Sequence, residues 1–172
     1  MRARGPRNAA RARRRAPPPV RLELTRRARG WLPARRELAH WASVAAGREA
    51  RGRELGVCVV GPTESARLNA RFRGLEKPTN VLSFGAATPA HAPAASACPL
   101  GELVVCPRVL AAEARAQEKT LKAHWAHLIV HGTLHLIGYD HAQRRDARRM
   151  ERREIAVLRR LGFANPYRER GA

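Results

Sequence analysis

Three histidines in the last third of the chain have the spacing of a catalytic metal site. His131 and His135 are four residues apart, so a helix places them one turn apart on one face, where two imidazoles can bind one metal ion. Gly138 follows, and a glycine can adopt the positive φ that lets the chain leave the helix and bring His141 back. Three neutral imidazoles with a fourth position left for water form a catalytic zinc arrangement. We therefore expect one Zn²⁺ per chain.

The residue after the first histidine decides which chemistry this spacing favours. Metzincin proteases share the pattern H-E-x-x-H-x-x-G-x-x-H, but Gly132 stands here where they have the glutamate that acts as general base. Zinc can lower the pKa of its bound water toward ~7 and polarise a phosphoryl oxygen without that base. Peptide hydrolysis also requires protonation of a poor amine leaving group. The pattern therefore favours phosphate chemistry, with a metzincin-like zinc metalloprotease as the alternative.

Two further residues are candidates for orienting the ligands. His127 lies one turn before His131 on the same face, but three ligands on one straight helix are spread too far along its axis for one tetrahedral ion. We expect His127 to stand behind the site rather than to replace His141. Glu154 falls on the apolar face of the final helix, which is unusual for a carboxylate. It is expected either to pair with an arginine or to hold a ligand histidine through a hydrogen bond.

The elements that position these residues follow from apolar periodicity. Strands are predicted at 20–24, 55–60, 79–84 and 103–106. Helices are predicted at 31–46, from Pro62 through 72, from Pro107 onward, at 121–137 and at 143–161. The segment 121–137 is apolar on nearly every side, so it should be a buried central helix with the zinc site at its end. The combination predicts a single α+β domain, with a small mixed four-stranded sheet and about five helices.

The charge of the chain points to a polyanionic partner. Lys and Arg number 34 against 14 Asp and Glu, giving +20, and eleven Arg against Glu23 alone give residues 1–30 a charge of +10. Such a surplus attracts nucleic acid, because neutralising phosphates releases counterions. Arg145 and Arg149 on the final helix are expected contacts for RNA or a partner. The composition of a GC-rich genome is the alternative explanation for much of the charge, because only three of the basic residues are lysine.

Composition also bounds the domain and the compartment. Residues 1–19 contain little but Arg, Ala, Pro and Gly, which predicts a disordered basic arm before a catalytic domain at 20–168 and a tail at 169–172. An organellar transit peptide is the alternative for the arm, although it lacks serine. Three cysteines without a C-x-x-C pair argue against a disulfide framework. No apolar run approaches the ~20 residues of a membrane span, so we expect a soluble, cytoplasmic protein with no membrane partner.

The histidine motif also carries a resemblance to a known family. The segment His131-Gly-Thr-Leu-His135-Leu-Ile-Gly-Tyr-Asp-His141 resembles the signature H-G-x-x-H-L-x-G-Y-D-H of the YbeY family, the zinc-dependent endoribonucleases and rRNA maturation factors of bacteria and organelles. The resemblance runs from about residue 20 to 168. It is supported by the segments 69–73, 78–84, 100–106 and 161–167.

The resemblance assigns roles to individual residues. It implies that His131, His135 and His141 bind zinc, that His131 is part of the catalytic centre, and that Arg73 is functionally important. A guanidinium offers a planar fork to a phosphate and can stabilise the charge that builds up during phosphodiester cleavage. The family usually has aspartate where this chain has Glu102, which makes this carboxylate a candidate contact for RNA or a partner.

The resemblance also implies a function and a set of partners. The expected activity is single-strand-specific endoribonuclease cleavage in rRNA maturation, at the 3′ end of the small-subunit rRNA, with a role in ribosome quality control. The expected partners are single-stranded rRNA, the small ribosomal subunit, and a ribosomal protein or assembly GTPase. Either zinc hydroxide or a ribose 2′-OH could attack, and the general base is unassigned. The alternative from another class is a ribosome-assembly factor whose zinc is structural.

Overall fold

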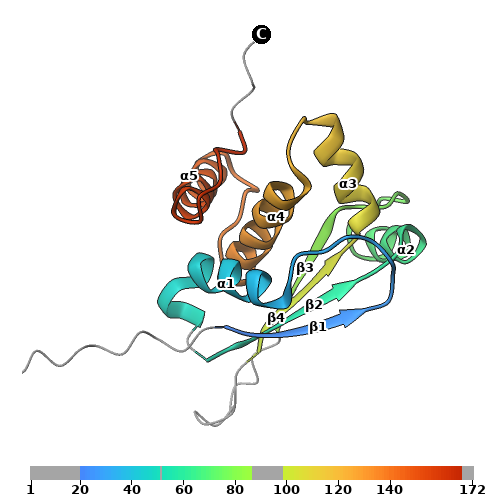
Figure 1. Cartoon of the computed structure of the whole chain (residues 1–172), viewed down its shortest axis with the longest axis horizontal. Coiled ribbons are helices and arrows are strands. Elements are labelled where there is room, and N and C mark those ends of the chain that lie inside the picture. The colour runs from blue at the N-terminus through green and yellow to red at the C-terminus, as the bar shows by residue number, and fades with distance from the viewer. Residues whose placement is uncertain (1–19, 51, 87–98, 168–172) are drawn as a thin grey trace, which may run out of the picture.

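The computed structural model of this protein describes residues 20–50, 52–86 and 99–167 (Figure 1). The predicted basic arm and the predicted tail lie outside the described residues. The elements in chain order are β1 (Arg21–Arg26), α1 (Arg35–Ala46), a 3₁₀ turn η1 (Gly47–Ala50), β2 (Glu54–Val59), α2 (Pro62–Arg73), β3 (Val81–Gly85), β4 (Pro99–Val105), α3 (Pro107–Ala116), α4 (Leu121–Leu136) and α5 (Arg144–Arg160).

The four strands form one mixed sheet in the order β1-β2-β4-β3. β1 and β4 both run parallel to β2, whereas the edge strand β3 is antiparallel to β4. The single α+β domain predicted from the sequence, with its four-stranded mixed sheet and five α-helices, is therefore confirmed for the part of the chain that the structure describes.

Two element boundaries differ from the prediction by four residues, and the others differ by at most two. β4 begins at Pro99 rather than at 103, because the register shift opposite Glu54 and Leu55 keeps Leu100 in the core, at 1% exposure. Gly101 and Glu102 interrupt the run of apolar residues, so the apolar pattern did not predict the first half of this strand. α1 begins at Arg35 rather than at Trp31, because Pro33 disfavours helical backbone in the residue before it.

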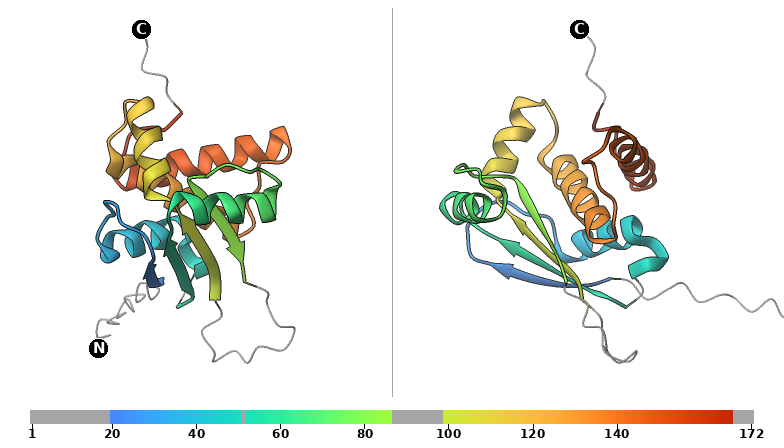
Figure 2. Two further views of the ribbon diagram at one scale, coloured as in Figure 1. Left: turned by 90° about the vertical axis from the view of Figure 1, so that its right-hand side faces the viewer. Right: turned by 180° about the vertical axis from the view of Figure 1, so that it is seen from behind.

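The sheet has a helical layer on each side, and the two layers differ in extent. α1, α4 and α5 lie on one side, and α2 lies on the other (Figures 1 and 2). Strand alternation divides the apolar residues accordingly, since Val57 and Val59 of β2 belong to the main core while Cys58 joins a smaller cluster. That smaller cluster packs against Leu68 of α2. The main core therefore fills the side on which the histidines lie.

α4 is the buried central helix that the sequence predicts. Trp125, Ile129 and Leu134 are fully buried, and each such side chain contributes roughly 1.5–3 kcal/mol by leaving water. The Thr120 hydroxyl caps the helix by accepting a hydrogen bond from the N–H of Ala123 at 3.2 Å. Gly132 faces the sheet, where an added Cβ would lie only 2.7 Å from Leu103 Cδ2. The glycine thus lets the helix pack closely on β4.

Membrane insertion through a helix finds no support in the fold. Among residues 20–50, 52–86 and 99–167, no helix combines the length and the apolar character that crossing a bilayer requires.

Candidate metal centre

The structure brings His131, His135 and His141 together at the C-terminal end of α4. One ring nitrogen from each lies within 4.8 Å of those of the other two. The ring centres are 4.7 Å apart for His131 and His135, and 4.8 Å apart for His135 and His141. A tetrahedral zinc ion with Zn–N bonds of about 2.1 Å separates its ligand nitrogens by about 3.4 Å, so small side-chain rotations suffice to close the triad around an ion.

The turn after α4 directs His141 toward the helix. Gly138 has a φ of +92° and its N–H donates to the carbonyl of His135 at 3.0 Å, while the N–H of Tyr139 donates to Leu134 at 3.0 Å. The Asp140 carboxylate then accepts the backbone N–H of His141 at 2.7 Å. That hydrogen bond holds the pKa of Asp140 below its usual value, so the carboxylate stays ionised and fixes the loop.

A buried carboxylate from α5 holds one of the three histidines. Glu154 is fully buried, and its Oε1 lies 2.6 Å from Nδ1 of His131. Its Oε2 accepts a hydrogen bond from the Tyr167 hydroxyl and lies 3.6 Å from Nε2 of His127. No arginine of the described chain pairs with it. Because an ionised carboxylate only accepts, Nδ1 of His131 must carry the proton, and Nε2 is left for a metal.

The ionisation of these groups suits metal binding. Burial alone would raise the pKa of Glu154, but the nearby His127 and the hydrogen bonds from His131 and Tyr167 outweigh burial and lower it to about 2. Burial, together with the neighbouring His131 and His141, lowers the pKa of His135. At neutral pH the site therefore combines a carboxylate with a neutral imidazole, which is the form of histidine that binds metals.

His127 lies behind the triad and has its own unsatisfied groups. Neither of its ring nitrogens has a hydrogen-bond partner among the described residues, and burial lowers its pKa, so it is neutral. With His131 and Glu154 it forms a second group whose ligand atoms lie within 4.8 Å of one another. Glu154 is buried in that group, whereas His141 in the triad is exposed. The triad is therefore the group with an open side for water and substrate.

Tyr167 is a residue of this centre that sequence reasoning did not single out. Its ring centre lies 5.5 Å from that of His127, and its hydroxyl reaches Glu154 from a segment beyond α5. Lys119 fastens that segment by donating to the carbonyl of Pro166 at 2.7 Å. Burial and the bond to Glu154 raise the pKa of Tyr167, so its hydroxyl remains a donor. The family-like segment 161–167 was the signal that could have pointed to it.

The remaining predicted residues lie away from the triad or on its rim. Arg149 places its guanidinium carbon 5.1 Å from the ring centre of Tyr139, in the loop that carries His141. Arg145 is exposed on the same helix, α5. Arg73 is the exposed last residue of α2 and makes no hydrogen bond or ion pair with any described residue. Glu102 lies in a pocket beside α2, on the other side of the sheet. Neither Arg73 nor Glu102 contacts the histidines.

The comparison with known families decides the affiliation. A family model described as endoribonuclease YbeY matches residues 33–162, which include the triad and Glu154 but stop before Tyr167. The chain belongs to the YbeY endoribonuclease family. The expected class of enzyme, a nuclease of rRNA maturation, is confirmed at the level of this family, and the histidine group is compatible with the family's metal dependence.

A solved structure supports the fold. The solution structure of TM1509 from Thermotoga maritima matches with a TM-score of 0.51 and 23% sequence identity, over 87% of this chain and 99% of that chain. At this identity the likeness concerns the fold. The sheet and helices that position the triad thus have a counterpart in an experimental structure.

Proposed function

We propose that this protein is a single-strand-specific, zinc-dependent endoribonuclease that matures the 3′ end of small-subunit rRNA and takes part in ribosome quality control. The observation that supports this proposal most strongly is the triad of His131, His135 and His141. Their ligand nitrogens lie within 4.8 Å of one another, and His141 is exposed. Membership of the family supports RNA cleavage as the reaction, and a metal ion held by the triad would catalyse it.

The donor set fits zinc. Three imidazoles are a known protein ligand set of catalytic zinc, which keeps its fourth position for water, whereas magnesium and calcium prefer oxygen ligands. When bound, zinc supplies a Lewis acid and lowers the pKa of a coordinated water toward ~7. Glu154 keeps the proton of His131 on Nδ1 and fixes the ring, since its carboxylate lies 2.6 Å from that atom.

The packing of Gly132 argues against the protease reading. An added Cβ there would meet Leu103 Cδ2 at 2.7 Å and Ser83 Oγ at 3.2 Å, so the position faces the sheet and cannot hold the glutamate base of a metzincin. The family and this packing both favour phosphodiester cleavage. The attacking group would be a metal-activated water or the 2′-OH of the RNA itself.

The arginines would bind the RNA backbone. Arg73 is exposed and unpaired among the described residues, so its guanidinium is free to hold a phosphate. Arg145 and Arg149 project from α5, and Arg149 sits beside the loop of His141. We propose the small ribosomal subunit as the site of action, in the cytoplasm, with a ribosomal protein or an assembly GTPase as a further partner.

The experiment compares two histidine variants on two substrates. The zinc-loaded wild type is expected to cleave single-stranded RNA and not casein. His135→Ala is expected to lose RNA cleavage by at least about a hundredfold because one of three ligands is missing. His40→Ala is the control, since His40 is exposed on α1 and belongs to neither group of candidate metal ligands among the described residues.

Two results would contradict the proposal. Casein cleavage that depends on His135 would indicate a protease. A His135→Ala protein that unfolds, combined with a wild type that never cleaves RNA at any zinc concentration, would indicate a structural zinc in an assembly factor.

A further inference from the structure

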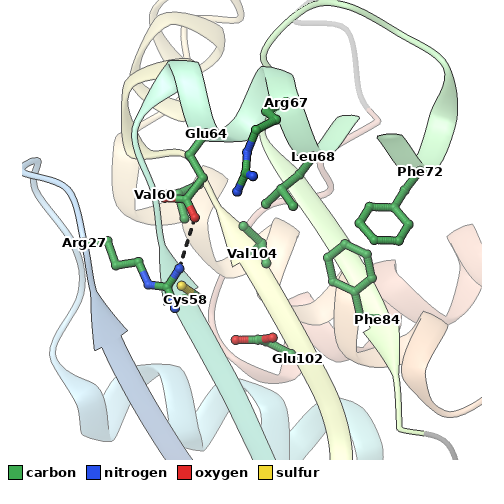
Figure 3. A pocket seen from close by; sticks show the side chains of 10 residues that line it. All are labelled: Arg27, Cys58, Val60, Glu64, Arg67, Leu68, Phe72, Phe84, Glu102 and Val104. Atoms are coloured by element: carbon green, nitrogen blue, oxygen red, sulfur yellow. Dashed lines mark hydrogen bonds and ion pairs between the residues drawn. The ribbon is translucent and has the colours of Figure 1, made fainter. Parts of the chain in front are cut away.

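A pocket lies between α2 and the side of the sheet that faces away from α4 (Figure 3). Its volume is about 290 Å³, close to the lower end of the roughly 300–1,000 Å³ typical of small-molecule sites. Val60 and Val104 contribute apolar walls, and Phe72 and Phe84 stand together at one end. The proposed nuclease activity uses none of these side chains.

Two opposite charges face this pocket without pairing. Arg67 reaches down from α2, and Glu102 lies across the sheet below it (Figure 3). Neither makes an ion pair with a described residue, although Arg27 and Glu64 pair at 3.1 Å in the same pocket. Gly56 allows the Glu102 stem to lie along β2, because a Cβ there would be 3.3 Å from Glu102 Cγ. The pocket thus presents a guanidinium and a carboxylate on separate sides.

The aromatic end of the pocket offers a stacking surface. The rings of Phe72 and Phe84 meet edge to face with centres 4.8 Å apart. Phe72 is 53% exposed, and the Arg71 guanidinium lies 5.3 Å from its ring centre. An exposed aromatic ring beside an arginine is the surface on which unstacked bases of single-stranded RNA bind.

We propose that this pocket binds an unstacked guanine of single-stranded RNA, an inference that rests on the proposed action on RNA. Guanine offers the acceptors O6 and N7 to the fork of Arg67, and the donors N1–H and N2–H to the carboxylate of Glu102. Cytosine and adenine place an acceptor beside their amino donor, which repels a carboxylate, and uracil has a single N–H. Guanine is therefore the base whose edges complement both charges.

The pocket is connected to the metal centre by a single strand. Among the described residues, β3 is an edge strand and pairs only with β4. Ser83 of β3 faces α4, with its Oγ 3.2 Å from the position of a Cβ on Gly132, next to His131. Phe84, the next residue, faces the pocket. An RNA strand that crosses the β3 edge would reach both sites, so the pocket would select a guanine a few nucleotides from the cleaved bond.

The test measures binding without cleavage. Full-length His141→Ala protein is titrated with fluorescent oligouridine that contains one guanosine, inosine, 7-deazaguanosine or adenosine. Inosine lacks the N2 amino group and 7-deazaguanosine lacks N7, so each removes one proposed hydrogen bond. We expect each substitution to weaken binding by roughly tenfold relative to guanosine.

Variants assign each loss to its side chain. In Glu102→Gln the inosine penalty is expected to shrink, because one of the two carboxylate oxygens becomes an NH2 group. In Arg67→Met the 7-deazaguanosine penalty is expected to disappear. Glu23→Gln is the matched control, because Glu23 is an exposed glutamate on β1 that lies in register with Gly56 but does not line the pocket. It should keep the full guanine preference.

Equal binding of all four oligonucleotides would overturn the inference, and so would equal behaviour of Glu102→Gln and Glu23→Gln. Loss of binding to the small ribosomal subunit in Glu102→Gln, with oligonucleotide binding unchanged, would identify a protein-docking site instead and also overturn it. Guanine preference in a protein that never cleaves RNA would leave the inference standing and refute the proposed nuclease.

Discussion

The residues behind the triad set how strongly it can hold a metal. Glu154→Gln replaces a charged acceptor of the His131 Nδ1–H with a neutral amide. We expect zinc affinity to fall about 10- to 100-fold, as for other hydrogen-bond partners of metal ligands. Competition with a chromophoric chelator measures it. Glu151→Gln, an exposed neighbour on α5, is the control and should match the wild type.

Tyr167 should act on the metal only through Glu154. Tyr167→Phe keeps the ring against His127 but removes the hydroxyl donor, so zinc affinity should fall by less than in Glu154→Gln. In the double variant the two losses should not add, because the hydroxyl has no other partner in the described chain. Additive losses in the same chelator assay would show that Tyr167 acts independently.

The low pKa of Glu154 predicts a pH dependence of stability. A carboxylate whose folded pKa is about 2, below its ordinary 4.5, stabilises the fold above pH 4.5 and loses that contribution as the pH falls toward 2. In metal-free protein, the difference in unfolding free energy between wild type and Glu154→Gln should therefore shrink as the pH falls below 4.5. Urea unfolding followed by tryptophan fluorescence measures it, and a difference that grows toward acid would contradict the assignment.

Sequence spacing predicted the meeting of the triad but not everything behind it. A helix fixes the relation of His131 to His135, and Gly138 accounts for the return of His141 with a φ of +92°. Glu154 was suspected because a carboxylate on an apolar face needs a partner. Tyr167 could not be predicted in this way, because nothing local in the sequence indicates that the chain beyond α5 folds back over α4.

At the level of elements, close contact between α4 and the sheet depends on Gly132. Replacing a helical glycine with alanine usually stabilises by about 1 kcal/mol. Here the methyl group would lie 2.7 Å from the fully buried Leu103, so we expect Gly132→Ala to destabilise by about 1–3 kcal/mol. Chemical unfolding measures the change. A variant as stable as the wild type would contradict this expectation and would mean that Leu103 and the sheet shift to make room for the methyl group.

Element types followed from the sequence, whereas their boundaries depended on tertiary context. The apolar runs of β2 and α4 are long enough to identify both elements. The start of β4 was missed because Gly101 interrupts the pattern at a register shift, which only pairing with β2 reveals. The side of the sheet on which Glu102 lies also depends on that register.

At the level of the whole molecule, the net charge of +20 should govern RNA binding. Because bound phosphates release counterions, the RNA affinity should fall linearly with the logarithm of salt concentration. Arg73→Ala should weaken RNA binding and reduce the slope of log affinity against log salt concentration by about one, because one phosphate contact is lost. The zinc affinity should be unchanged, because Arg73 does not contact the triad. Fluorescence anisotropy across a salt series measures the slope. An unchanged slope would show that Arg73 does not contact a phosphate of the bound RNA.

The most direct measurement is a zinc titration of metal-depleted, full-length protein, with cleavage of single-stranded RNA as the readout. Cleavage should rise in proportion to added zinc and saturate at one Zn²⁺ per chain, and His141→Ala should neither bind the ion tightly nor cleave. Full cleavage by the metal-depleted protein, or undiminished cleavage by His141→Ala, would contradict a zinc centre at the end of α4.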